Sequence, residues 1–381
     1  MINQIAVIGA GAMGTGIAQV FASFGYETIL YDLNQDSLVK SRNKLQDVFN
    51  MLVQKGKITD SEAKSSFSRI HFASSLAGVK NADLVIEAII EKLEVKQSLF
   101  KELEGLVSES CILASNTSSL SVTSIASACN RPGRVIGLHF FNPVPLMKLV
   151  EIIPAVQTHT ATIETCKKLV DGIMKYGVLA KDTPGFIVNK VARPFYSESF
   201  RIYEEGIADF ATIDWALTEF GGFKMGPFTL TDFIGHDVNY TVTESVWTAF
   251  YFDPRYTPAF CQKKLVEAGY LGKKAGKGFY DYSENSQNPS PLQDENLGKS
   301  IFHRVHAMLV NEAADTIHRG ICTLEDVETA MTKGVNYPKG LINWGEELGY
   351  DYIVELLDGL YDYYHEARYR VSPYLRNKIN S

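Results

Sequence analysis

Short apolar runs alternate with longer amphipathic segments along about the first 180 residues of the chain. The apolar runs are typical of strands buried on both faces of a sheet, and the segments between them are long enough for helices. This alternation predicts an α/β fold, a parallel sheet with helices on both faces, whose ligands bind beyond the carboxyl ends of the strands. The predicted strands are 5–8, 28–31, 83–88, 111–115, 135–139 and 148–153, and the predicted helices are 18–24, about 35–57, 92–107 and 163–176.

Three glycines follow the first predicted strand with the spacing G-x-G-x-x-G: Gly9, Gly11 and Gly14. The first allows a tight turn, the second lets a pyrophosphate approach the backbone, and the third lets helix and strand pack closely. A glycine-rich turn alone gives the same spacing, but the strand before it and the helix after it favour a dinucleotide site. Asp32 ends the second strand, about 20 residues beyond the glycines, where a carboxylate binds ribose hydroxyls. Because that carboxylate would repel a 2′-phosphate, the pattern predicts a Rossmann domain that binds NAD.

A histidine and a carboxylate form the second chemical candidate. His139 ends a predicted strand beside Asn142 and Pro143, and Glu151 lies in the next apolar segment, where a buried acid needs a partner. A carboxylate on one ring nitrogen fixes the tautomer and stabilises the imidazolium. The other nitrogen then takes a hydroxyl proton as hydride leaves. The alternatives are a structural His–Glu pair, or two residues that never meet.

The composition is that of an ordinary globular protein of two or three domains, with 381 residues, 45% hydrophobic and 21% charged. A net charge of −7 argues against a nucleic-acid or polybasic membrane binder, so an anionic substrate would need local cations. The five cysteines are scattered, which predicts free thiols in a reducing cytoplasm and no metal site. No apolar run approaches about 18 residues, so we expect no membrane span. The chain opens on a predicted strand, so we expect no signal peptide.

The C-terminal half contains a repeat. A shift of 114 residues superimposes 189–237 on 303–351 without a gap and pairs Glu198 with Glu312 and several glycines, among them Gly235 with Gly349. This predicts a duplicated helical unit. Asn189 of the first copy meets His303 of the second, so we expect the second copy to be structural, without an active site. The predicted domains are 1–182, the NAD-binding domain; 183–282, the first helical copy; 283–299, a linker; and 300–381, the second helical copy.

Longer motifs carry a more specific resemblance. The segments 115–119 (SNTSS), 139–151 (HFFNPVPLMKLVE) and 182–189 (DTPGFIVN) resemble the L-3-hydroxyacyl-CoA dehydrogenase family, in order, and the likeness extends over about residues 1–282. The resemblance implies reversible NAD-dependent oxidation of (S)-3-hydroxyacyl-CoA to 3-ketoacyl-CoA. We expect 3-hydroxybutyryl-CoA as substrate, with 3-hydroxyadipyl-CoA as an alternative. Two further alternatives are a catalytically silent NAD-binding homologue and a hydroxyacid dehydrogenase without CoA, in which Lys190 would be the base.

The resemblance also implies residue roles. His139 is the general base and Glu151 its orienting carboxylate, while Ser118 and Asn189 hydrogen-bond the substrate around its 3-oxygen and thioester. Ser118 has a plainer alternative role, as the cap of a helix. Lys55 matches a lysine that binds CoA, and Val48 stands where some family members have serine. The cofactor contacts that the resemblance implies are Gly9, Gly11 and Gly14 at the pyrophosphate, Asp32 at the ribose, and Glu91, Lys96, Asn116 and Lys274 elsewhere on NAD.

Tandem helical copies resemble the dehydrogenase part of the multifunctional fatty-acid oxidation enzymes. In those enzymes the second copy takes the place of a second subunit's domain. The resemblance therefore implies an internal pseudo-dimer of the two copies, with a homodimer of whole chains as a further possibility.

Overall fold

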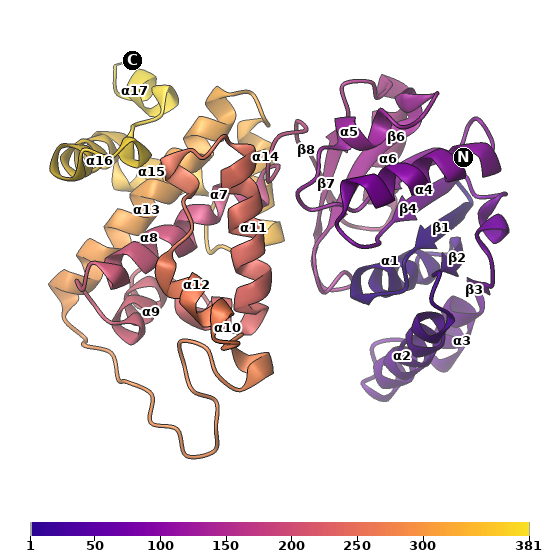
Figure 1. Cartoon of the computed structure of the whole chain (residues 1–381), viewed down its shortest axis with the longest axis horizontal. Coiled ribbons are helices and arrows are strands. Elements are labelled where there is room, and N and C mark those ends of the chain that lie inside the picture. The colour runs from indigo at the N-terminus through magenta and orange to yellow at the C-terminus, as the bar shows by residue number, and fades with distance from the viewer. Residues whose placement is uncertain (1, 381) are drawn as a thin grey trace. The chain divides into compact units, whose positions relative to one another are not determined.

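The computed structural model describes residues 2–380 and divides into two compact units (Figure 1). The first unit ends at Phe186 and the second begins at Ile187. The first is built on a sheet and the second is helical.

Eight strands form one sheet in the first unit, in the order β3-β2-β1-β4-β5-β6-β7-β8. All neighbouring pairs are parallel except β6 and β7, so the prediction of an α/β Rossmann-type domain is confirmed with one antiparallel pair added. The strands are β1 (Gln4–Ile8), β2 (Glu27–Tyr31), β3 (Ile70–Ala73), β4 (Leu84–Glu87), β5 (Ile112–Ser115), β6 (Val135–Phe140), β7 (Leu149–Pro154) and β8 (Tyr176–Leu179).

Helices cover the sheet because its strands are apolar on both faces. Alternate strand residues such as Val7, Ile86 and Leu138 pack in one cluster with the inner faces of α1, α2 and α6. Their neighbours in sequence, such as Ala6 and Val85, are equally buried on the opposite face. The helices of this unit are α1 (Ala12–Ser23), α2 (Gln35–Gln54), α3 (Asp60–Ser68), α4 (Leu93–Leu106), α5 (Val122–Ala126) and α6 (Thr160–Gly172), with short 3-10 turns η1 (Leu76–Val79) and η2 (Pro132–Arg134).

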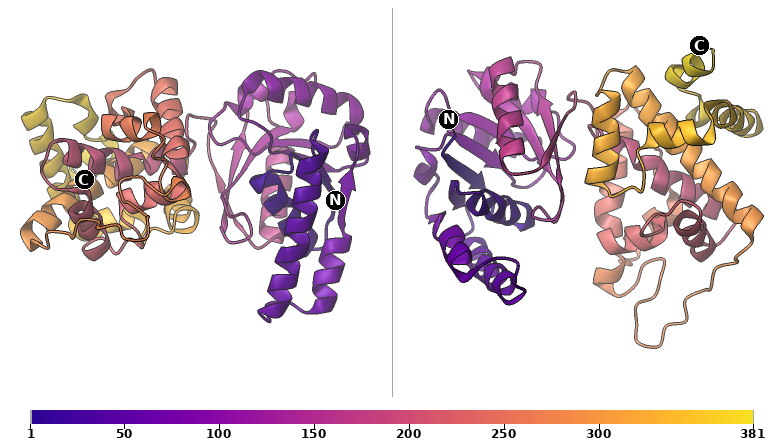
Figure 2. Two further views of the ribbon diagram at one scale, coloured as in Figure 1. Left: turned by 60° about the horizontal axis from the view of Figure 1, so that its bottom comes forward. Right: turned by 180° about the vertical axis from the view of Figure 1, so that it is seen from behind.

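The strands β3 and β8 were not predicted. In addition, β6 and β7 are joined by a hairpin, where a parallel crossover was expected. The predicted helix 163–176 ends at Gly172, and Tyr176–Leu179 continues as β8. β3 follows the hairpin of α2 and α3, which projects from the sheet (Figures 1 and 2). Only residues 141–148 separate β6 from β7, which is too short for a parallel crossover, and the chain therefore turns back as a hairpin.

The second unit is helical, and its helices repeat with the sequence. α9, α10 and α11 begin 114 residues before α14, α15 and α16, and Gly235 (φ 101°) and Gly349 (φ 96°) adopt the same left-handed backbone before α11 and α16. The helices are α7 (Val188–Val191), α8 (Arg193–Glu204), α9 (Phe210–Glu219), α10 (Pro227–Ile234), α11 (His236–Ala249), α12 (Phe260–Glu267), α13 (Glu295–His318), α14 (Leu324–Gly334), α15 (Leu341–Leu348), α16 (Tyr350–Tyr364) and α17 (Pro373–Ile379), with 3-10 turns η3 (Pro254–Tyr256), η4 (Lys273–Ala275) and η5 (Ala367–Tyr369).

An extended loop joins the two copies (Figure 2). It is shorter than the predicted linker of 283–299, because α13 begins already at Glu295. Asp294 caps that helix, and its carboxylate accepts a hydrogen bond from the Leu297 amide at 2.8 Å. Elsewhere in the chain, none of the helices within residues 2–380 is long and apolar enough to cross a membrane. All five cysteines are free thiols.

His306 on α13 gives a prediction for the acid stability of the second unit. The side chain is buried, and neither ring nitrogen has a hydrogen-bond partner among residues 2–380. Burial lowers the pKa of His306 to about 3, and His303 and Lys339 act in the same direction. The unfolded chain binds a proton near pH 6.5, whereas the folded chain binds it only near pH 3. Between those values the free energy of unfolding should therefore fall as the pH falls, by about 1.4 kcal/mol per unit.

Replacement of His306 by leucine should remove this dependence. Urea unfolding of wild type and His306→Leu at pH 7.5 and pH 5 measures it. The stability of the wild type should drop more between the two pH values than that of the variant. Equal drops would show that His306 is not a source of acid sensitivity.

Candidate active site

His139 and Glu151 lie opposite each other on the antiparallel pair β6 and β7. His139 Nδ1 is 2.6 Å from Glu151 Oε2, and the two side chains are 7% and 0% exposed. A carboxylate can only accept here, so Nδ1 carries the proton and donates. The ring therefore directs Nε2 away from Glu151, as a base that receives a proton from a substrate requires.

Two phenylalanines fix the plane of the His139 ring. The ring centroid of Phe141 lies 4.4 Å from that of His139, and the centroid of Phe186 lies 5.9 Å away. Phe186 is buried and has a positive φ of 49°, after Gly185 with φ 73°. The motif at 182–186 thus forms a turn that places an aromatic ring against the histidine. The Glu151 contact and the two aromatic rings together restrict the orientation of the His139 ring.

A buried ion network holds the end of β4 and the start of α4. Lys96 is 1% exposed, and its Nζ lies 2.5 Å from Glu87 Oε1 and 3.1 Å from Glu91 Oε2. Glu87, which is fully buried, also accepts a hydrogen bond from Ser115 Oγ at 2.6 Å, so the network reaches the end of β5. Glu87 was not among the residues predicted for the site. The available signal was a single carboxylate inside a buried apolar strand, which requires a cation nearby.

Glu91 fastens the loop that contains Ser118. Its Oε1 accepts hydrogen bonds from Thr117 Oγ1 at 2.5 Å and from the Ser118 amide at 2.9 Å. Burial alone would raise the pKa of Glu91, but the charge of Lys96 and these hydrogen bonds outweigh it and keep the pKa below its usual value. Glu91 therefore stays ionised and holds the loop at the carboxyl end of β5.

Ser118 is not a helix cap. The N-cap of α5 is Ser121, whose Oγ accepts from the Ser124 amide at 3.1 Å. Asp182 also binds this helix start, accepting from the Val122 and Thr123 amides at 2.9 and 2.7 Å. Ser118 lies before the helix, half-exposed, in the loop that Glu91 holds. Asn116, two residues before Ser118, is buried and accepts from the Phe140 amide at 2.9 Å, which joins the ends of β5 and β6.

The three glycines after β1 have the geometry of a dinucleotide turn. Gly9 has φ 106°, and a Cβ there would lie 2.4 Å from the Ala88 carbonyl oxygen. A Cβ on Gly14 would lie 1.8 Å from the Gly9 carbonyl oxygen, so only glycine lets α1 approach the strand this closely. A Cβ on Gly11 would meet nothing within 4 Å, so the backbone there is open to a ligand. These are the three separate demands that a pyrophosphate site makes.

A cavity of about 850 Å³ lies at these glycines. Gly9, Gly11 and Asp32 line it, and one Asp32 oxygen accepts from the Ala10 amide at 2.7 Å. Glu94 and Glu102 add further carboxylates, and no Lys or Arg is among the described residues of the lining. This lining suits an adenosine with free ribose hydroxyls and opposes a 2′-phosphate. The residues therefore fit NAD.

A second cavity of about 660 Å³ lies between α1, α2 and the 142–148 loop. Its lining is mostly apolar, but four lysines reach it: Lys44, Lys57, Lys148 and Lys175. Lys175 donates to the carbonyl oxygens of Val144 at 2.7 Å and Met147 at 2.5 Å, and burial lowers its pKa to about 8. Lys55, the lysine singled out from sequence, is exposed at the end of α2 and is not part of this lining, whereas Val48 is. Lys44 was missed, although it lies one helical turn before Val48.

Three sequence-predicted residues lie in the second unit. Asn189 is half-buried on α7, and its carbonyl oxygen accepts from Arg193 Nε at 2.8 Å. Lys190 is fully buried and pairs with Glu312, and its Nζ donates to Thr316 Oγ1 at 2.8 Å. An ammonium committed in this way is no general base, so the alternative with Lys190 as base is wrong. Lys274 lies 2.6 Å from Asp237 Oδ1 near the start of α11.

Two family models match the chain almost end to end. The model for the "3-hydroxyacyl-CoA dehydrogenase, NAD binding domain" matches residues 4–183. The model for the C-terminal domain of the same family matches residues 185–282 and again 301–381. The chain belongs to the 3-hydroxyacyl-CoA dehydrogenase family. It is an NAD-dependent oxidoreductase.

Individual relatives of this dehydrogenase agree with that assignment. A "3-hydroxyadipyl-CoA dehydrogenase" of Escherichia coli is 35% identical, with 99% of this chain and 97% of the relative covered. A "Probable 3-hydroxybutyryl-CoA dehydrogenase" of Bacillus subtilis is 41% identical over 75% of this chain and 99% of its own length. The crystal structure of a 3-hydroxybutyryl-CoA dehydrogenase from Escherichia coli superimposes with a TM-score of 0.93, at 35% identity, over 99% of this chain and 98% of that one.

Proposed function

We propose that His139 is the general base of this 3-hydroxyacyl-CoA dehydrogenase and that Glu151 orients it. The observation that carries the proposal is the 2.6 Å contact between His139 Nδ1 and Glu151 Oε2. In the oxidative direction His139 Nε2 takes the proton of the 3-hydroxyl, and the Glu151 carboxylate stabilises the imidazolium that forms. NAD, when bound, supplies the hydride acceptor. In the reductive direction the same imidazolium returns its proton to the 3-oxygen.

The remaining residues bind and orient the reactants. Ser118 and Asn189 are neutral donors suited to the 3-oxygen and the thioester, because they stabilise developing negative charge without titrating. At the cofactor, Gly9, Gly11 and Gly14 receive the pyrophosphate and Asp32 the ribose. Glu91 and Lys96 act there by holding the 117–119 loop, since Lys96 is committed to two carboxylates. Asn116 and Lys274 stay candidates for further cofactor contacts.

The substrate carries CoA, whose phosphates need cations. Lys44, Lys57 and Lys148 line the apolar cavity beside α2 and suit that need, whereas Lys55 stays a prediction on the rim of the same hairpin. We favour 3-hydroxybutyryl-CoA as the acyl substrate. The second candidate is 3-hydroxyadipyl-CoA. A relative that aligns with this chain over 97% of its own length is named for that substrate.

The two helical copies pair, in our proposal, as an internal pseudo-dimer. Lys190 of the first copy pairs with Glu312 of the second, and Arg304 of the second copy pairs with Glu198 of the first at 2.7 Å. The repeat superimposes Lys190 on Arg304 and Glu198 on Glu312. Each copy therefore supplies the cation of one ion pair and the carboxylate of the other. Such reciprocity is the property of an isologous interface. We also propose a cytoplasmic location, which the free thiols support.

Reduction of acyl-CoA substrates by NADH tests the function. Acetoacetyl-CoA should be turned over, as followed by the loss of absorbance at 340 nm, while NADPH should be poorer by about tenfold or more in kcat/KM because like charges meet at Asp32. Free acetoacetate should react far more slowly than its CoA ester. A kcat/KM that is higher for 3-oxoadipyl-CoA than for acetoacetyl-CoA would identify 3-hydroxyadipyl-CoA as the preferred substrate. No turnover of any 3-ketoacyl-CoA would reject the proposal and leave a silent homologue.

A further inference from the structure

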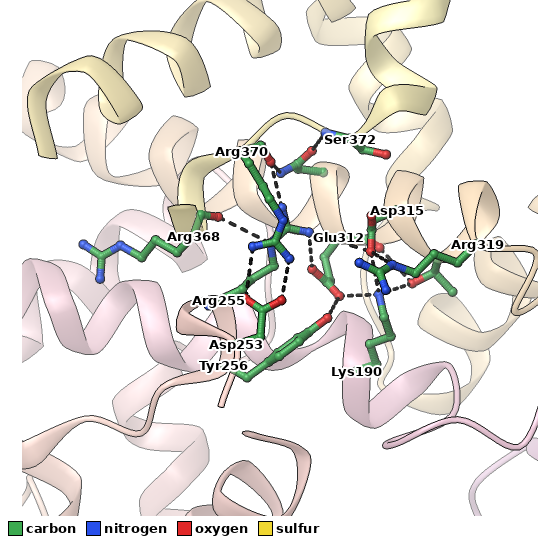
Figure 3. Close-up of polar contacts among 12 residues, drawn as sticks. Lys190, Asp253, Arg255, Tyr256, Glu312, Asp315, Arg319, Arg368, Arg370 and Ser372 are labelled. Carbon is green, nitrogen blue, oxygen red and sulfur yellow. Dashed lines mark hydrogen bonds and ion pairs between the residues drawn. The ribbon is translucent and has the colours of Figure 1, made fainter. Parts of the chain in front are cut away.

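Lys190, the residue after Asn189, ties the first helical copy to the second. It is fully buried, and its ammonium contacts only α13 of the second copy in the part of the chain that the structure describes. It pairs with Glu312, donates to Thr316 Oγ1 at 2.8 Å and lies 3.5 Å from Asp315 Oδ2 (Figure 3). Two hydrogen bonds, to Glu312 and Thr316, and the ion pair with Asp315 hold the ammonium in place.

Glu312 is the centre of this cluster. Lys190, Arg255 and Tyr256 converge on its carboxylate in Figure 3, with Tyr256 Oη donating at 2.5 Å and Arg255 Nη1 at 3.2 Å. Burial alone would raise the pKa of Glu312, but the charges of Lys190 and Arg255 outweigh it and hold the pKa below its usual value. Glu312 is therefore ionised, and its removal would leave the buried Lys190 and Arg255 with only the more distant Asp315 as a counter-charge.

The repeat supplies the same arrangement a second time. Glu198 receives Arg304 Nε at 2.7 Å and Tyr369 Oη at 2.8 Å. The neighbour of Arg304 is His303, whose Nδ1 lies 2.8 Å from Tyr352 Oη, whereas the neighbour of Lys190 is Asn189. Two similar buried pairs thus differ in what lies next to them. One adjoins a proposed substrate ligand and the other does not.

We propose that Glu312 is a positioning residue for the reaction: through Lys190, it lets the second copy hold Asn189 in place. The inference rests on the proposed contact of Asn189 with the acyl-CoA substrate. α7 spans only Val188–Val191, and Ala192 alone separates it from α8. The buried Lys190 anchors this short turn, and Asn189 with it, to α13 of the second copy. The second copy, which we expect to be structural, would act on the site through this contact.

Steady-state kinetics of the full chain test the proposal with matched variants. Glu312→Gln should lower kcat/KM for acetoacetyl-CoA by about ten- to a hundredfold, as a displaced substrate ligand does, while the KM for NADH stays within about twofold. The control is Glu198→Gln, which breaks the equivalent pair and should leave both parameters unchanged at a temperature where both variants are folded. Lys190→Arg, which reproduces the cation of the other pair, should retain most of the activity.

Milder variants keep the test valid if Glu312→Gln does not fold. Tyr256→Phe removes one hydrogen bond to Glu312, and Tyr369→Phe removes the equivalent bond to Glu198. Tyr256→Phe should lower kcat/KM for acetoacetyl-CoA by about threefold or more, and Tyr369→Phe should not. Equal kinetics of Tyr256→Phe and Tyr369→Phe would overturn the proposal.

A double-mutant cycle separates this proposal from the one on which it rests. If Glu312 acts through Asn189, Glu312→Gln should cause no further loss of kcat/KM in an Asn189→Ala background. An additive loss would overturn the positioning role, as would an impaired Asn189→Ala variant beside a fully active Glu312→Gln variant. Unchanged kinetics of Asn189→Ala would reject the substrate contact itself, and the positioning role with it.

Discussion

Replacement of His139 by glutamine should lower kcat for the NADH-dependent reduction of acetoacetyl-CoA by about 10²–10⁴-fold. The imidazole is the only titratable group that β6 and β7 bring together with Glu151 in the described sheet. In the reductive direction it delivers the proton that the new alkoxide needs, and an amide cannot do so. Binding of NADH should be unaffected, because the glycines follow β1 and Asp32 follows β2, and His139 does not line their cavity.

A second buried histidine provides the control. His236 lies 2.6 Å from Asp232 Oδ1, and its Nδ1 is 3.4 Å from Gln262 Nε2, so both ring nitrogens are used within the fold. This is what a structural histidine–carboxylate pair looks like. His236→Gln should therefore cost stability and leave kcat unchanged in the folded protein. A His139→Gln variant with wild-type kcat would remove His139 as the base, and a loss of NADH binding would point to a folding defect.

The cofactor half of the site was predictable because its demands are local. Gly9, Gly11 and Gly14 each meet a different backbone requirement within one turn, and each requirement appears in the sequence as a glycine at a fixed spacing. Asp32 follows directly from the end of the next strand. Nothing beyond the order of strand, turn and helix was needed for that part of the prediction.

The His139–Glu151 contact could be predicted from the sequence only if the direction of β7 relative to β6 was known. A purely parallel sheet separates consecutive strands by a crossover, and nothing then sets the two side chains opposite each other. The short 141–148 connection forces a hairpin, and the hairpin register pairs the residues directly. Loop length was therefore the decisive and unused signal for this pair.

Other parts of the site depend on buried ion pairs that the spacing of the motifs does not reveal. Lys96 looked like a cofactor-side cation, yet Glu87 and Glu91 occupy its ammonium inside the unit. Lys190 looked like an alternative base, yet its partner lies more than a hundred residues away on α13. The repeat shows that Glu198 and Glu312 are equivalent positions. The fold adds that each of these glutamates pairs with a cation of the other copy.

Replacement of Glu151 by glutamine should lower kcat by about 10²–10⁴-fold without loss of the fold. Glutamine has nearly the same shape, so the packing between β6 and β7 is kept. It carries no charge to stabilise the imidazolium, and its amide group can donate to Nδ1, which would place the ring proton on Nε2 and block the base. The KM for NADH should change little, because Glu151 lines neither cavity.

Three measurements separate orientation of the histidine from general destabilisation. Glu151→Asp retains the charge but shortens the side chain, so its kcat should lie between those of wild type and Glu151→Gln. Glu328→Gln neutralises a carboxylate that binds the start of α15, where Oε1 accepts from the Ile342 amide at 2.8 Å, and should leave kcat unchanged. Thermal unfolding shows whether each variant is folded at the assay temperature. A folded Glu151→Gln enzyme with wild-type kcat would make the His139–Glu151 contact structural, and proton transfer would then need only the imidazole.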